Sequence, residues 1–133
     1  MTSTTTPALR VMRILSTLLL LATGGIHLFL VFDGVGGVLG VLFVLNAVAA
    51  LVLAIGMAAL RGRLLQSATV LSLLFLIATL GALLLALTVG LFGITEVWTF
   101  TLVPQTVVVE SVGIVVLAVT TVLVLRGGTP GRR

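Results

Sequence analysis

The chain has 133 residues, of which 60% are hydrophobic and 8% are charged, and its net charge is +4. Soluble domains contain about 45–50% apolar and about 25% charged residues, so this composition excludes a water-soluble globular domain and indicates a protein whose solvent is lipid. The sequence has no cysteine and one histidine. It therefore offers no disulfide framework and no conventional zinc site, and we expect neither a bound metal nor a cofactor.

The first apolar stretch, 14–32, follows Arg10 and Arg13. A positive segment before an apolar run also begins a secretory signal peptide. Here the run continues past the length of a signal peptide, and no small-residue cleavage motif ends it, so the pattern favours a retained membrane helix. The chain ends, 1–10 and 126–133, are predicted to be flexible.

Three further apolar stretches follow, at 38–60, 64–92 and 103–125. Each exceeds the roughly 20 residues that a membrane-spanning helix needs. The third, at roughly 43 Å if wholly helical, is longer than the hydrocarbon core is thick, so we expect it to tilt. The last stretch is rich in valine and threonine, but an isolated strand would leave its backbone unpaired in lipid. We predict an all-α fold, an integral membrane four-helix up-down bundle forming one domain.

The charges predict the orientation of the bundle. Arginines lie before the first span, between the second and third, and after the fourth, whereas Asp33 and Glu96 lie in the other two connections. With four spans, all arginine segments share one side, so the positive-inside rule places both termini on the cytoplasmic side of the cell membrane. We expect contact with anionic lipid headgroups there, and not with nucleic acid. The orienting residues are Arg10, Arg13, Arg61, Arg63 and Arg126.

Two kinds of side chain indicate how the spans sit in lipid and against one another. Trp98 and Phe100, before the fourth span, are typical of anchors at headgroup depth. Small residues at steps of four predict faces of close helix contact. They are Asn46, Ala50, Ala54 and Ala58 in the second span and Ala78, Ala82, Ala86 and Gly90 in the third.

Three polar residues from three different spans share one depth. At about 1.5 Å of rise per residue, His27, Asn46 and Glu110 all lie about 9–12 Å inside the end of the bundle opposite the termini. Gln105 lies closer to that end and on another side of its helix. A carboxylate in hydrocarbon must be neutral, paired or hydrated. A contact between His27 and Glu110, oriented by the Asn46 amide, would satisfy it.

Three interpretations of this cluster stay open. Glu110 is a protonated residue that hydrogen-bonds between helices, a contact for a partner protein, or part of a site for a proton, ion or polar ligand. One histidine cannot supply two haem ligands within one chain.

The chain resembles the small four-helix integral membrane proteins of actinobacteria that have no assigned function. The resemblance depends on GGIHL at 24–28, on GVLFVLNAVAALVLA at 40–54, on LTVGLFGITE at 87–96, and on a fourth helix with a buried glutamate, here Glu110. It implies the four-span fold and no catalytic residue.

We expect a non-enzymatic scaffold or accessory subunit of a membrane complex, acting as a homo-oligomer or with a membrane-protein partner. The sequence has short loops and small-residue faces, and we find no catalytic motif in it. The alternative is a small proton-coupled carrier that uses His27, Asn46 and Glu110. An enzyme acting on lipid is less supported, because only one acid–base pair is present.

Overall fold

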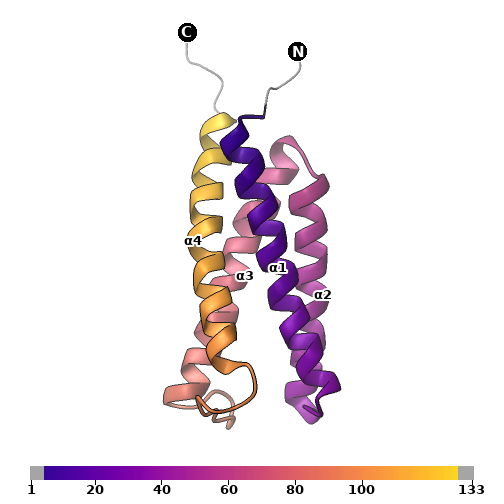
Figure 1. Ribbon diagram of the computed structural model, residues 1–133, viewed down its shortest axis with the longest axis vertical. Helices are drawn as coiled ribbons and strands as arrows, with labels where there is room; N and C mark the ends of the chain where they lie inside the picture. The colour runs from indigo at the N-terminus through magenta and orange to yellow at the C-terminus, as the bar shows by residue number, and fades with distance from the viewer. Residues whose placement is uncertain (1–4, 129–133) are drawn as a thin grey trace.

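A computed structural model describes residues 5–128 of the chain as four helices. They are α1 (Pro7–Phe32), α2 (Gly37–Ala59), α3 (Gly62–Thr88) and α4 (Val103–Gly127). The helices run up and down beside one another (Figure 1), which confirms the predicted all-α four-helix bundle. All four are long and apolar enough to cross a membrane. The protein is therefore a multi-pass integral membrane protein.

The bundle has two unlike ends (Figure 1). The start of α1, the end of α4 and the short turn between α2 and α3 lie at one end, which we call the terminal end. The turn between α1 and α2 and the longer loop 89–102 lie at the other, the loop end. The arginines of the described chain therefore gather at the terminal end, and Asp33 and Glu96 at the loop end, as the predicted topology requires.

The helix bounds differ from the prediction by more than two residues at two places, the start of α1 and the end of α3, and by at most two residues elsewhere. Residues 7–10, predicted to be flexible, are helical, because Pro7 occupies a first-turn position and the Thr6 hydroxyl accepts the N–H of Leu9 at 3.3 Å. The third helix stops at Thr88 and not at 92, because Gly90 adopts a positive φ of 86° and its N–H bonds the Leu85 carbonyl at 2.8 Å. The fourth continues to Gly127. The rest of the predicted flexible ends, 1–4 and 129–133, lies outside the described residues.

The buried residues of α4 recur at alternating steps of three and four. This is the spacing of a helix that keeps one seam against its partners. The seam contains polar as well as apolar side chains, while the valines between them face outward. An apolar exterior around a partly polar interior is the arrangement that lipid favours. The seam consists of Val103, Thr106, Glu110, Gly113, Leu117, Thr120 and Val124.

Hydroxyl groups inside the bundle are mostly satisfied within their own helices. Thr69 and Ser72 donate to the carbonyls of Leu65 and Ala68, each at 2.7 Å. One pair joins two helices, because the hydroxyls of Ser16 on α1 and Thr120 on α4 lie 3.1 Å apart.

The apolar core fills the middle of the bundle and its terminal half. Leu20, Met57, Leu76 and Leu117 are each 0% exposed there and come from all four helices. Gly113 lets α4 approach α3 at this level, since a Cβ on it would meet the Leu76 side chain at 2.5 Å. The helices are therefore packed around one apolar core from their midpoint toward the terminal end.

The two predicted small-residue faces have different outcomes. On α2, Ala50 and Ala54 are buried, and a Cβ on Gly24 of α1 would meet the Ala50 Cβ at 2.9 Å, so close contact is confirmed there. Ala58, on the same predicted face, is exposed. On α3, Ala78, Ala82 and Ala86 line a cavity of this chain. The pattern does not separate contacts within a chain from contacts between chains, so a contact of this face between chains stays a prediction.

Arg13 closes the end of α2 from the neighbouring helix. Its guanidinium donates to the carbonyls of Met57 (2.8 Å), Ala58 (3.2 Å) and Leu60 (2.9 Å). The last carbonyls of a helix have no partner within the helix. Arg13, predicted only as an orienting residue, therefore also joins α1 to α2.

Replacing Arg13 with glutamine should lower the free energy of unfolding by about 1.5–3 kcal/mol, because hydrogen bonds from a charged donor are lost. The matched change Arg10→Gln, at an exposed position one turn earlier, should cost less than about 0.5 kcal/mol. Denaturation in mixed micelles measures both. Equal losses for the two variants would contradict the capping role.

A second pair of variants tests the contact between α1 and α2. Gly24→Ala should destabilise the protein by about 1–3 kcal/mol, because the new methyl group meets Ala50 and cannot move away. Gly25→Ala points into open space and should be neutral or stabilising by up to about 1 kcal/mol. The same denaturation assay compares them, and a Gly24→Ala variant as stable as Gly25→Ala would show that the helices are not in close contact.

Candidate functional site

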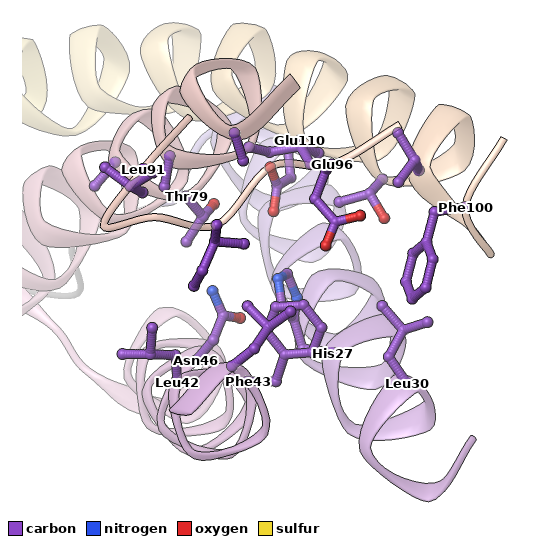
Figure 2. Close-up of a pocket in the computed structure, with 18 of the residues that line it drawn as sticks. His27, Leu30, Leu42, Phe43, Asn46, Thr79, Leu91, Glu96, Phe100 and Glu110 are labelled. Atoms are coloured by element: carbon purple, nitrogen blue, oxygen red, sulfur yellow. The ribbon is translucent and has the colours of Figure 1, made fainter. Parts of the chain in front are cut away.

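A cavity of about 340 Å³ occupies the loop half of the bundle. All four helices and the loop 89–102 contribute to its wall. Figure 2 shows the side chains of His27, Asn46, Glu96 and Glu110 pointing into one space from different parts of the chain. Most of the remaining wall is apolar, with leucine, alanine and phenylalanine side chains. The cavity thus combines an apolar wall with a few converging polar groups, which is typical of ligand sites.

The space exists because α2 and α3 diverge toward the loop end. These two helices make the least contact of the four neighbouring pairs, whereas α1 and α2 make the most. On α3, the cavity wall includes the small Ala78, Ala82 and Ala86 beside Thr79 and Leu83. Small side chains on separated helices leave a volume that neither helix fills.

The loop 89–102 covers the end of the cavity and is held in place by backbone hydrogen bonds. The N–H of Glu96 bonds the carbonyl of Ala86 at 2.9 Å, and Leu91 and Ile94 bond each other in both directions at 2.8–2.9 Å. The first contact folds the loop back onto the end of α3. It brings the side chains of Glu96 and Phe100 to the cavity.

Glu110 lies on the buried seam of α4 and is 1% exposed. Neither of its carboxyl oxygens has a hydrogen-bond partner among the described residues. The Thr79 hydroxyl approaches the carboxyl from α3, but its hydrogen bond goes to the Leu76 carbonyl at 3.2 Å. Buried polar groups are nearly always hydrogen-bonded, so an unpartnered carboxyl at a cavity wall points to a missing partner.

His27 is held by two contacts. Its ring packs edge-on against Phe43 of α2, with ring centres 4.9 Å apart and planes at 89°. Its Nδ1 lies 2.9 Å from the Thr23 carbonyl oxygen. A carbonyl only accepts, so Nδ1 bears the proton, and in the neutral ring Nε2 is left as an acceptor.

The structure brings the three predicted site residues to one cavity but does not pair them. The Asn46 carboxamide oxygen is buried and has no partner among the described residues, as with both Glu110 oxygens. The predicted contact, in which His27 satisfies Glu110 and Asn46 orients them, is therefore wrong as a hydrogen-bonded group. The three side chains face a common space instead of one another (Figure 2).

The predicted anchors have different positions. Trp98 is 53% exposed in the loop 89–102, at the end of the bundle where an anchor is expected. Phe100 is half-buried and lines the cavity (Figure 2), so its ring belongs to the cavity wall. Gln105 is exposed, on the side of α4 away from Glu110.

Glu96 is the site residue that the sequence analysis missed. The sequence predicts a connection between two spans at Glu96, and neither its spacing nor its neighbours distinguish it from Asp33 in the other connection. The described residues contain no group of three His, Asp or Glu side chains that could hold a metal ion. The arrangement is suited to taking up a proton or to pairing with a cation.

No family model, no curated protein and no solved structure matches this chain. The resemblance to small four-helix actinobacterial membrane proteins stays a prediction.

The state of Glu110 predicts an unusual result for its removal. Replacing an unpartnered buried polar group with an apolar one of similar shape is neutral or stabilising, so Glu110→Leu should lose no more than about 0.5 kcal/mol of stability. Thr120→Val, which removes a hydroxyl paired between helices, should lose about 0.6 kcal/mol. Denaturation in mixed micelles compares them. A loss of about 1–2 kcal/mol for Glu110→Leu with a neutral Glu110→Gln would instead identify Glu110 as a structural link between helices.

Proposed function

We propose that this protein is a small proton-coupled carrier whose binding site is the cavity in the loop half of the bundle. The observation that supports it best is the Glu110 carboxyl, 1% exposed at the wall of a 340 Å³ cavity and without a hydrogen-bond partner among the described residues. A carboxyl that only linked helices would have a partner. One that binds a proton and a cation in turn exchanges them at the cavity and needs no fixed partner in the protein.

Protonation of Glu110 is the chemical step that the site offers. A carboxylate in an apolar environment is costly, so in the absence of a cation the group takes up a proton from water and becomes neutral. The other titratable side chains at the cavity are His27 from α1 and Glu96 from the loop, while α2 and α3 contribute none. Glu96, nearest the loop end, provides a step for protons between water and Glu110.

The orientation and the lipid contacts belong to the same proposal. The positive-inside rule supports cytoplasmic termini in the cell membrane, so the cavity lies in the outer half of the bilayer. Arg10 is exposed and lines a second cavity of about 310 Å³ at the terminal end, which suits contact with an anionic headgroup. The scaffold or accessory-subunit role and a homo-oligomeric state stay predictions, because no contact within the described residues bears on them.

Proton movement by the full-length protein in liposomes tests the proposal. Vesicles that contain an entrapped pH-sensitive dye receive a pH difference, and the rate of its collapse is measured. Wild-type protein should speed the collapse above the rate of protein-free vesicles. Glu110→Gln should return it to that rate, because glutamine cannot bind and release a proton.

Ala118→Leu is the matched control, since Ala118 is exposed on α4 and does not line the cavity. It should behave as wild type. No acceleration by wild-type protein, or an unchanged rate in a folded Glu110→Gln variant, would refute the carrier role.

A further inference from the structure

The cavity presents mostly hydrogen-bond acceptors. Both Glu110 oxygens and the Asn46 carboxamide oxygen have no partner, and the neutral His27 ring offers Nε2 as an acceptor. Glu96 adds a second carboxyl at the rim, at the loop. A ligand that matches these groups has to be rich in donors and, because carboxyls predominate, positively charged.

Two of the three threonines of the wall, Thr79 and Thr106, do not supply the missing donors. Thr79 donates to the Leu76 carbonyl at 3.2 Å, and Thr106 donates to the Leu102 carbonyl at 2.7 Å. Each hydroxyl has one proton, so both present only lone pairs to the cavity. The amide nitrogen of Asn46 and the hydroxyl of Thr101, which is exposed in the loop, are donors that remain.

The remaining wall sets the shape of the ligand. Leu39, Leu42 and Phe43 of α2 line the cavity together with Ala82 and Ala86 of α3. A volume of about 340 Å³ has room for roughly ten non-hydrogen atoms, at about 30 Å³ for each water-sized unit. The polar groups come from His27 on α1, Asn46 on α2, Glu96 in the loop and Glu110 on α4, and most of the remaining wall is apolar, so a charged head and an apolar body both find matching groups.

We infer that the cavity binds an amphipathic organic ammonium ion, whose head pairs with Glu110 and whose apolar body lies between α2 and α3. The inference rests on the proposed function only in that the cavity is a binding site, and it does not require transport. An ammonium group supplies up to three N–H donors, which the Glu110 and Asn46 oxygens accept.

Charge is conserved when the ammonium ion replaces the proton on Glu110. Before binding, Glu110 holds a proton as a neutral carboxyl. When R–NH₃⁺ enters, that proton leaves to water and the ammonium ion pairs with the carboxylate. The net charge of the site is unchanged, and no other bond forms or breaks. Binding should therefore release up to one proton for each ammonium ion.

The test uses full-length protein in detergent and n-octylammonium chloride, whose chain fits a cavity of this size. Titration calorimetry gives the affinity, and a pH indicator in weak buffer gives the released protons. Octan-1-ol and octanoate, of the same chain length, are the neutral and anionic comparisons. We expect octylammonium to bind at least about tenfold more tightly than either, with proton release, since only it pairs with a carboxylate.

Three variants assign the binding to the cavity. Glu110→Gln should weaken octylammonium binding at least about tenfold and abolish proton release. Ala82→Leu keeps Glu110 but fills the space between α2 and α3, so it should also lose binding, and it provides the test if Glu110→Gln does not fold. Ala118→Leu adds the same atoms to an exposed position of α4 and should bind as wild type. Partition into micelles is common to all variants and cancels in the comparison.

Equal binding of octan-1-ol, or octylammonium binding that survives both Glu110→Gln and Ala82→Leu, would overturn the inference. The liposome experiment separates it from the carrier proposal. Octylammonium binding without proton flux supports the ligand class and refutes transport, whereas Glu110-dependent flux without octylammonium binding supports the carrier and refutes the ligand class.

Discussion

The absence of water along the four helices is the constraint on which the rest of the structure depends. It requires every backbone group to be bonded within a helix, and it removes the reason for polar side chains to face outward. The seam of α4 shows the result, with Thr106, Glu110 and Thr120 inside and valines outside. It also explains why the Arg13 guanidinium donates hydrogen bonds to the carbonyls at the end of α2, which have no partner within that helix. Stability in lipid depends on such satisfied polar groups and on close packing.

Under the same constraint, the loop half of the bundle differs from the terminal half in hydrogen bonding and in packing. In the terminal half, buried hydroxyls find carbonyls or one another, and Leu20, Met57, Leu76 and Leu117 fill the space between helices. In the loop half, the Thr23 hydroxyl, the Asn46 carboxamide oxygen and both Glu110 oxygens are buried without partners among the described residues, and those of Asn46 and Glu110 lie beside a volume of about 340 Å³. Proteins depart from good packing and polar satisfaction mainly where function requires it. The contrast between the two halves, more than any single residue, supports a binding site.

Prediction from the sequence succeeded for features that depend on a single stretch of chain. It failed for features that depend on how one helix lies against another. The four spans follow from apolar length, and the α1–α2 contact follows from small residues such as Ala50. The α3 face of alanines had the same pattern but a different outcome, because the pattern does not say whether another helix approaches. Gly90 was a visible helix-ending signal, yet it also fitted the step of four that predicted a contact face. His27, Asn46 and Glu110 were placed at one depth by counting residues, which cannot show which way each side chain points.

The sequence by itself determined the solvent, the number of spans and the polar residues that lie within them, because these depend on composition and on rise along a helix. Only the tertiary structure decided that α2 and α3 separate toward the loop end, that Glu96 and Phe100 fold back over the opening, and that His27 and Glu110 face a shared space without bonding. These features arise from the relative positions of whole helices and of a loop that one backbone bond ties to Ala86. Such positions are set by all contacts together, and no short stretch of sequence encodes them.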